Sequence, residues 1–273
     1  MPTQSRHSIR AQLAETRPPV RSAEPPSILR KAARKAAALR SAERREAARF
    51  RALSRIAGVL SPHYVMTAPE KAWFHDEQFF REFYAFEDHD QTADRKYMLR
   101  QLLSLVDLVP GDTAECGVYL GASSWFICNH FRSSGRSHHG FDSFEGLPEP
   151  NPVDGSFWHT GDLRTREEHA LELLRPFDAH LYAGWFPDRF GEVADRAFAF
   201  AHVDVDLYQP TLDSLEFFYP RMSPGGVILL DDHGLTTCPG ATRAAEEYMA
   251  GRLESIVLLT TGQAMILKVA EPQ

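Results

Sequence analysis

The sequence has few cysteines and no long apolar run. Its three cysteines, Cys116, Cys128 and Cys238, form no C-x-x-C pair. The odd number and the missing pair argue against a disulfide framework and a cysteine-based zinc site, and they favour a reducing, cytoplasmic location. No window approaches the roughly 18 apolar residues that a membrane span needs. Residues 1–20 lack the apolar core of a secretory signal, so we expect no such signal.

Charge is unevenly distributed along the 273 residues. Residues 1–60 carry 14 Lys and Arg against 4 Asp and Glu, whereas the remaining chain carries 16 against 33. The basic part is rich in Ala, Leu and Arg and favours a solvated helix that packs on its own domain or on a second copy. A basic arm that binds RNA or an anionic membrane is the alternative. No RNA-binding, helix-turn-helix or zinc signature accompanies it, so we expect no specific nucleic-acid partner.

Composition divides the chain into four predicted parts. Residues 1–27 are rich in proline and poor in large apolar side chains, which predicts a disordered tail. Residues 28–60 form the basic helical extension. Residues 61–109 form a predicted helical cap. Its part 69–109 reads as two helices with crowded aromatic side chains, which pack in the core or form a lid over a site. Residues 110–273 form the main domain.

Strands and helices alternate in the main domain. Strands are predicted in residues 113–120, 137–144, 178–184, 198–207 and 225–232, with helices between them, and two further strands flank Gly262. The alternation predicts an α/β fold with a mainly parallel sheet, helices on both faces and an antiparallel edge hairpin at the C-terminus. In such sheets ligands bind beyond the carboxyl ends of the strands, so functional residues are expected there.

The first two strands end in residues suited to a nucleotide-like ligand. Gly117 and Gly121 allow a tight turn and a close approach of the backbone to a ligand, although a simple packing turn is the alternative. The segment lacks G-x-G-x-x-G, which disfavours a dinucleotide and therefore an NAD-dependent oxidoreductase. Asp142 follows Glu115 by 27 positions, where nucleotide-binding sheets place the carboxylate that binds the ribose hydroxyls.

Four carboxylates follow two later strands. Asp204 and Asp206 are two positions apart and are expected on one side of an extended strand, and Asp231 and Asp232 are adjacent. Carboxylates that converge repel one another unless a cation compensates them. Oxygen ligands suit Mg²⁺, Ca²⁺ or Mn²⁺ better than zinc. We expect Asp204, Asp231 and Asp232 to hold such a cation, and Asp206 to cap the following helix.

Five motifs, in order along the chain, resemble those of the macrocin-type sugar O-methyltransferases. They are ECGVYLGAS, DSFEGLPEP, AGWFPD, HVDVDLYQPTLDSLEFFYPRMSPGGVILLDD and PGATRAAEEYMA, and the resemblance spans roughly residues 95–268. It implies a seven-stranded class I methyltransferase (Rossmann-like) sheet, S-adenosylmethionine, typically Mg²⁺, and a homo-oligomer. The implied cofactor contacts are Glu115, Gly117, Tyr119 and Ser123 at the methionine end, Asp142 and Ser143 at the ribose, and Gly184 and Trp185 near the adenine. The implied metal ligands are again Asp204, Asp231 and Asp232.

The expected reaction is methylation of a hydroxyl on a small molecule, foremost a (deoxy)sugar of a glycosylated natural product with a vicinal diol. Asp204 is the first choice of base, and His233 is the second because imidazole titrates in the useful range; a packing role for His233 is the alternative. Residues 147–161 and 62–95 are expected to shape the acceptor pocket. A catechol- or phenol-directed methyltransferase and a non-catalytic binding protein that uses the basic arm remain alternative functions.

Overall fold

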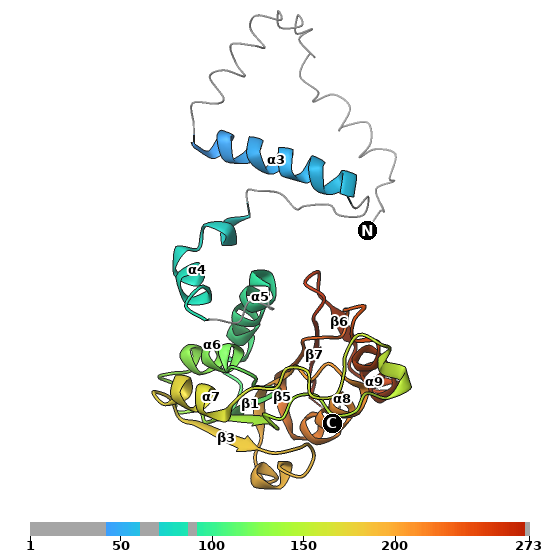
Figure 1. The fold of residues 1–273 in the computed structure, drawn as a ribbon. Coiled ribbons are helices and arrows are strands. Elements are labelled where there is room, and N and C mark those ends of the chain that lie inside the picture. Colours follow the sequence, from blue (N-terminus) through green and yellow to red (C-terminus); the bar gives the residue numbers. More distant parts are fainter. Residues whose placement is uncertain (1–41, 61–70, 87–91, 271–273) are drawn as a thin grey trace, which may run out of the picture. The chain divides into compact units, whose positions relative to one another are not determined.

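The computed structural model describes residues 42–60, 71–86 and 92–270 (Figure 1). It divides into two units, residues 1–75 and residues 76–273, and we describe each by itself. The predicted tail, the first part of the basic extension and parts of the predicted cap lie outside the described residues. No helix in the described ranges is both long and apolar enough to cross a membrane.

The first unit contains helix α3 (Ala42–Leu60), which agrees with the helix predicted for this stretch. A short 3₁₀ helix, η1 (Ala72–His75), follows. The ring of Phe50 lies 6.1 Å from that of Phe74, whose ring lies 4.4 Å from that of Trp73. Phe50 of α3 therefore has an aromatic partner within its own unit, whereas Leu53, Ile56, Val59 and Leu60 are exposed.

In the second unit the described residues form one seven-stranded sheet, in the order β3-β2-β1-β4-β5-β7-β6. The five parallel strands are β1 (Asp112–Cys116), β2 (His138–Asp142), β3 (Ala179–Ala183), β4 (Phe198–Val203) and β5 (Met222–Leu230). Strand β7 (Ala264–Leu267) runs antiparallel to β5, and β6 (Ile256–Leu258) pairs with β7 at the edge. The predicted α/β sheet and its antiparallel edge hairpin are confirmed.

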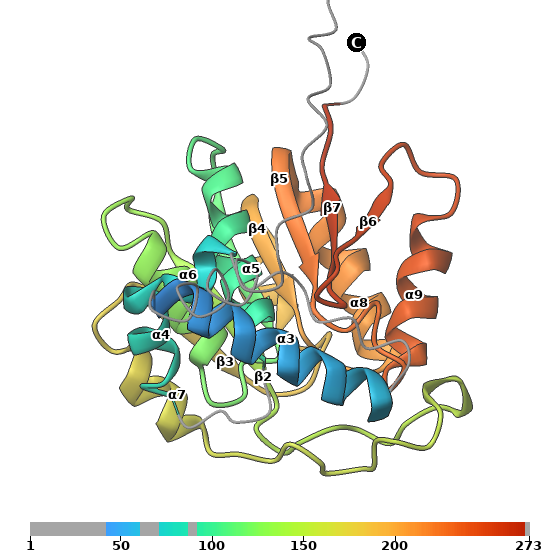
Figure 2. The same cartoon turned by 90° about the horizontal axis from the view of Figure 1, so that it is seen from above.

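Helices cover both faces of the sheet (Figure 2). One layer contains α5 (Ala93–Leu103), α6 (Ala122–His130) and α7 (Glu167–Leu174). The other contains α8 (Tyr208–Phe218) and α9 (Pro239–Met249). Short 3₁₀ helices occur at η2 (Ser104–Val106), η3 (Pro152–Asp154), η4 (Phe190–Val193) and η5 (Tyr219–Arg221). All six residues of β4 are buried, as expected for a central strand covered on both faces.

One aromatic residue of the predicted cap, Phe79, packs into the core of the second unit. Helix α4 (Glu77–Phe83) begins at Asp76, whose carboxylate accepts a hydrogen bond of 2.8 Å from the Phe79 N–H. The Phe79 side chain is fully buried, with its ring 5.0 Å from Tyr97 and 6.0 Å from Phe126. This aromatic residue is therefore part of the core, and a lid role for the remaining cap stays a prediction.

The strand order places a switch point between β1 and β4. From β1 the sheet grows toward β2 and β3 in one direction, and from β4 toward β5 in the other. The helices that follow β1 and β4 therefore lie on opposite faces, and a crevice forms beyond the carboxyl ends of the strands. The residues predicted to be functional follow the strands on both sides of this point.

Candidate functional site

A cavity of about 740 Å³ lies at the carboxyl edge of the parallel strands. The residues that follow five strands contribute to its wall: Gly117 and Tyr119 after β1, Asp142 and Ser143 at the end of β2, Gly184 and Trp185 after β3, Asp204 and Asp206 after β4, and Asp232 after β5. The structure thus brings most of the predicted site residues to one cavity.

The turn after β1 is pressed against the chain that follows β4. Gly117 has φ +87°, and a Cβ atom there would lie 1.7 Å from the carbonyl oxygen of Asp204. The Gly117 N–H donates to the Phe141 carbonyl at 2.9 Å, and the Asp204 N–H donates to the Cys116 carbonyl at 2.9 Å. A side chain at Gly117 has no room, so this glycine lets the two halves of the cavity wall meet.

Asp142 and Ser143 hold neighbouring turns together as well as lining the cavity. The Asp142 carboxylate accepts hydrogen bonds from the N–H groups of Tyr119 at 2.8 Å and Phe144 at 2.7 Å. Burial raises the pKa of Asp142, and these bonds oppose the rise. The Ser143 hydroxyl donates to the Gly146 carbonyl at 3.1 Å. Their predicted contact with a ribose stays a prediction.

Glu115 and Ser123 are not among the residues that line the cavity. Glu115 is fully buried, with Oε1 2.7 Å from Nδ1 of His202 and Oε2 accepting from the Ser124 hydroxyl. Burial raises the pKa of Glu115, but the hydrogen bond and charge of His202 outweigh it and hold the pKa below its ordinary value. The Ser123 hydroxyl is buried beside Nζ of Lys96. A cofactor contact for either residue stays a prediction.

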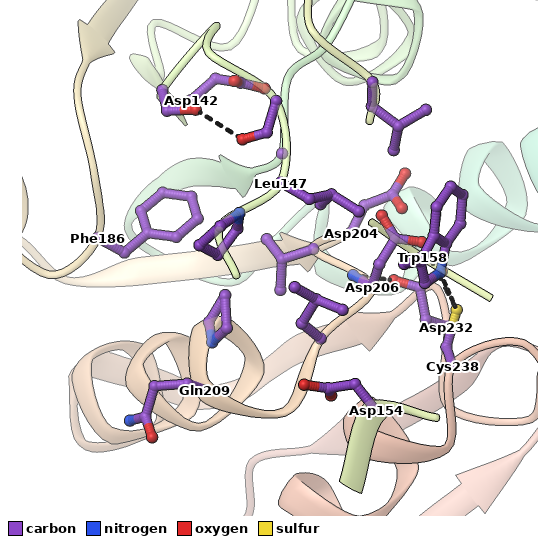
Figure 3. Close-up of a pocket in the computed structure, with 18 of the residues that line it drawn as sticks. Asp142, Leu147, Asp154, Trp158, Phe186, Asp204, Asp206, Gln209, Asp232 and Cys238 are labelled. Atoms are coloured by element: carbon purple, nitrogen blue, oxygen red, sulfur yellow. Dashed lines mark hydrogen bonds between the residues drawn. The ribbon is translucent and has the colours of Figure 1, made fainter. Parts of the chain in front are cut away.

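Three carboxylates lie together on one side of the cavity, Asp204, Asp206 and Asp232, whereas Asp142 lies apart from them (Figure 3). The Asp206 N–H donates to Oδ2 of Asp232 at 2.9 Å. Burial, followed by the charge of Asp204, raises the pKa of Asp232 to about 6. Burial and the charges of Asp232 and Asp204 raise the pKa of Asp206 well above its ordinary value. The like charges thus oppose one another here.

Asp231 lies behind this group and is held by buried polar partners. Its Oδ1 accepts from Nε2 of Gln263 at 2.5 Å and lies 3.1 Å from Nε2 of His202. The guanidinium of Arg95 contacts its Oδ2 and lies 3.4 Å from Oδ1 of Asp232. The two adjacent aspartates thus differ, because Asp232 faces the cavity and Asp231 is tied to the sheet interior.

The model of the macrocin-O-methyltransferase (TylF) family matches residues 94–254. The chain belongs to this family. It is 34% identical over 156 residues to an 8-demethyl-8-(2,3-dimethoxy-alpha-L-rhamnosyl)-tetracenomycin-C 4'-O-methyltransferase of Streptomyces olivaceus, over 50% of this chain and 58% of that protein. It is 30% identical over 162 residues to the mycinamicin III 3''-O-methyltransferase of Micromonospora griseorubida, over 53% of this chain and 63% of that protein. The chain thus spans about three fifths of the length of these curated relatives.

Solved structures agree with the fold. The O-methyltransferase NovP superposes with a TM-score of 0.55 at 26% identity, over 65% of this chain and 81% of its own. The calicheamicin methyltransferase CalS11 superposes with a TM-score of 0.58 at 20% identity, over 75% and 95% of the two chains, which speaks for the fold alone. The class I methyltransferase fold that the sequence motifs implied is confirmed, and so is the family resemblance.

The donor atoms fit a hard divalent cation of the kind the family resemblance implies. Atoms of His202, Asp204 and Asp231 lie within 4.8 Å of one another. A second group, Asp206, Asp232 and Cys238, adjoins it. Carboxylate oxygens dominate both groups, which suits Mg²⁺, Ca²⁺ or Mn²⁺. Asp204 and Asp231 come together as predicted, and Asp232 belongs to the adjacent group.

The prediction that Asp206 caps α8 is wrong. The first N–H of that helix, on Tyr208, donates instead to Oδ1 of Asp154 at 2.7 Å. Asp206 has φ +59° and lines the cavity, with the Cys238 thiol 3.5 Å from its Oδ1. Strand β4 ends at Val203, so the alternation of an extended strand does not explain why Asp204 and Asp206 share this side. The left-handed backbone at Asp206 instead turns its side chain toward the cavity, on the side where Asp204 lies.

His233 lies outside the set of residues that line the cavity. It is buried, and its Nδ1 has no hydrogen-bond partner among the described residues. Burial lowers its pKa. A role as base therefore has no support from the cavity geometry and stays a prediction.

The loop expected to shape the acceptor pocket does contribute to the cavity wall. Its lining residues are Leu147, Pro148, Glu149, Asn151, Asp154, Phe157 and Trp158. Asp154 anchors the loop to α8 as described above, and the indole N–H of Trp158 donates to Sγ of Cys238 at 3.3 Å (Figure 3). From residues 62–95 the described part supplies Arg95, which the sequence reasoning did not single out.

Proposed function

We propose that this chain transfers a methyl group from S-adenosylmethionine to a hydroxyl of a sugar-bearing small molecule, foremost a (deoxy)sugar of a glycosylated natural product. One observation carries the proposal: a single cavity joins the glycine turn and Asp142 to a group of buried carboxylates. The first part suits a nucleoside-like donor, and the second suits a metal-assisted hydroxyl. A curated relative that is named for 4'-O-methylation of a rhamnosyl-tetracenomycin supports the acceptor class.

The side chains of the cavity would divide the work between donor and acceptor. S-adenosylmethionine would supply the methyl group, and a divalent cation such as Mg²⁺ would lower the pKa of the acceptor hydroxyl. Asp204, Asp231 and Asp232 would hold the cation. The walls at Gly117, Tyr119, Ser143, Gly184 and Trp185 would orient the donor, together with Asp142. Most of the rate gain would come from fixing the two reactants in line.

Of the two bases that the sequence offers, the geometry favours Asp204. Its carboxylate faces the cavity, whereas His233 is not among the lining residues. An anionic carboxylate at the acceptor side can take the hydroxyl proton as the methyl group is transferred. Asp204→Asn keeps the size and removes both this capacity and the negative charge of a proposed metal ligand, so methyl transfer should fall.

The acceptor class is tested by turnover. The full chain is incubated with S-adenosylmethionine, Mg²⁺ and three acceptors: a glycoside with a vicinal diol, the same glycoside lacking one of the two hydroxyls, and a catechol. Mass spectrometry detects the gain of one methyl group. Methylation of the diol glycoside is expected, and turnover of the catechol alone would favour the phenol-directed alternative.

The cation is tested by Asp232→Ala and Asp231→Ala. Each variant should lower kcat by roughly a hundredfold or more, because several kcal/mol of electrostatic stabilisation are lost. The calorimetric affinity for S-adenosylmethionine should stay within a few-fold of the unaltered chain. Full activity of the unaltered chain in excess EDTA would contradict the metal role.

We further propose that the protein is a cytoplasmic homo-oligomer. The cysteine pattern favours a reducing compartment, and the resemblance implies an oligomer. Light scattering coupled to size-exclusion chromatography measures the oligomeric state, and a monomer would contradict it.

A further inference from the structure

Arg95 reaches from α5 into the acidic side of the cavity. Its side chain is only 13% exposed. The guanidinium contacts Oδ2 of Asp231, donates to the Asp231 carbonyl oxygen at 3.2 Å, and lies 3.4 Å from Oδ1 of Asp232. Within the described residues it is the only basic side chain in the cavity lining.

The charge of Arg95 compensates the carboxylates around it. Its guanidinium contacts Asp231 and lies 3.4 Å from Oδ1 of Asp232, so one fixed positive charge stands between two adjacent carboxylates. Without a nearby cation, the buried carboxylates would repel one another. The guanidinium therefore stabilises the ionised acidic group when no metal ion is bound.

The contacts of Arg95 are those that a metal ion would need. Two of the three proposed metal ligands, Asp231 and Asp232, present oxygen atoms to the guanidinium. A divalent cation at the same oxygens would lie within a few ångströms of a fixed positive charge, in surroundings that screen charge weakly. The two cations cannot both keep these contacts at low cost.

We propose that Arg95 is a built-in counter-ion that competes with the divalent cation and must withdraw from Asp231 and Asp232 when the cation binds. The proposal rests on the proposed function only through the location of the cation. Arg95 thereby controls the affinity for the metal ion. Its positive charge stabilises the neighbouring carboxylates in the metal-free protein, and the same charge weakens cation binding.

The test compares the full chain with Arg95→Gln, and Arg100→Gln is the matched control. Arg100 lies on the same helix and pairs with Asp76 at 3.0 Å, and it is not among the residues that line the cavity. Mn²⁺ and Mg²⁺ are titrated calorimetrically without donor or acceptor. Arg95→Gln should bind each ion about tenfold or more tightly, because one positive charge next to the site is gone.

Thermal unfolding supplies a second readout. In EDTA, Arg95→Gln should melt below the unaltered chain, because its carboxylates lose their counter-ion. Saturating Mg²⁺ should raise its melting temperature by more than it raises that of the unaltered chain, since a ligand that binds only the folded state stabilises it by mass action. Arg100→Gln should show the same metal affinity as the unaltered chain.

Two further variants keep the result decisive. Arg95→Lys retains the positive charge but lacks the planar guanidinium. It should therefore fold even if Arg95→Gln does not, and its metal affinity should rise less than that of Arg95→Gln. Adding Asp232→Asn to Arg95→Gln should abolish the gain. Equal or weaker metal binding by Arg95→Gln, a gain that persists in the double variant, or no metal binding by any variant would overturn the proposal.

The methyl-transfer assay separates this proposal from the proposed function. Methyl transfer with unchanged metal affinity in Arg95→Gln refutes the competition and leaves the enzymatic function standing. If Arg95→Gln shows the predicted gain in metal affinity but the unaltered chain methylates no acceptor, the competition is confirmed and the proposed function is contradicted.

Discussion

Gly117→Ala is the sharpest perturbation that the cavity wall offers. The backbone at Gly117 has φ +87°, and the added Cβ atom would lie 1.7 Å from the carbonyl oxygen of Asp204. A Cβ contact needs at least 3.0 Å, so the turn and the chain after β4 must move apart by about 1.3 Å. The displaced oxygen belongs to Asp204, which we propose as metal ligand and base.

Gly121→Ala is the matched control. Gly121 has φ +88°, but its Cβ would first meet the flexible side chain of Leu173 at 3.3 Å. The left-handed backbone destabilises both variants by about 1–2 kcal/mol. Overpacking destabilises Gly117→Ala by a further 1–3 kcal/mol, roughly. The free energy of unfolding should therefore fall by about 1–2 kcal/mol in Gly121→Ala and about 2–5 kcal/mol in Gly117→Ala.

The larger difference should be in the chemistry. A displacement of about 1 Å in a reacting geometry can cost roughly a hundredfold in rate, so kcat/KM should fall by that order in Gly117→Ala. Urea unfolding measures stability, and turnover of the diol glycoside measures kcat/KM. If Gly117→Ala matches Gly121→Ala in both measurements, the close approach of Gly117 to Asp204 does not shape the site.

Two more predictions follow from buried contacts. In Gly240→Ala the new Cβ would lie 1.8 Å from Oδ1 of Asp154, so the loop anchored there should detach and the acceptor KM should rise several-fold, whereas Gly191→Ala, with nothing within 4 Å, should not change it. Burial lowers the pKa of His138 from 6.5 to about 4, so the unfolded chain binds the proton first and stability falls on acidification between these values, by up to about 3 kcal/mol. Urea titrations across this pH range should show a shallower decline in His138→Gln, and an unchanged decline would assign it to other groups.

The order of elements was predictable because alternating apolar segments report burial directly. The five parallel strands and the helices between them lie where the apolar patterns predict them, within a few residues. The edge hairpin followed from two short apolar segments around Gly262, which has φ +89°. What the pattern could not report is the packing of the cap: Phe79 is a core residue through Tyr97 and Phe126, which are distant in sequence.

Arg95 and Asp206 show why part of the cavity was missed. Arg95 stands in the predicted helical cap, where no local pattern marks it as functional, and only the fold brings it to carboxylates that are 136 and 137 residues away in the chain. Asp206 precedes a helix, where an aspartate usually acts as a cap. The cap is supplied by Asp154 from a distant loop, so the local pattern at Asp206 could not distinguish the two roles.

Glu115 shows that a motif residue can serve a site without facing it. Its carboxylate contacts Nδ1 of His202, and Nε2 of the same ring contacts Asp231, so one imidazole joins β1 to the residue after β5 beneath the cavity. Two carboxylates on one ring hold its orientation, and the ring in turn holds Asp231, as partners behind a metal ligand generally do. The presence of Glu115 in the motif therefore has a sufficient physical reason in the support of the acidic centre, whether or not it contacts the donor. Because a role of this kind depends on a partner 87 residues away, the family resemblance implies only the cofactor contact, and the packed sheet reveals the support.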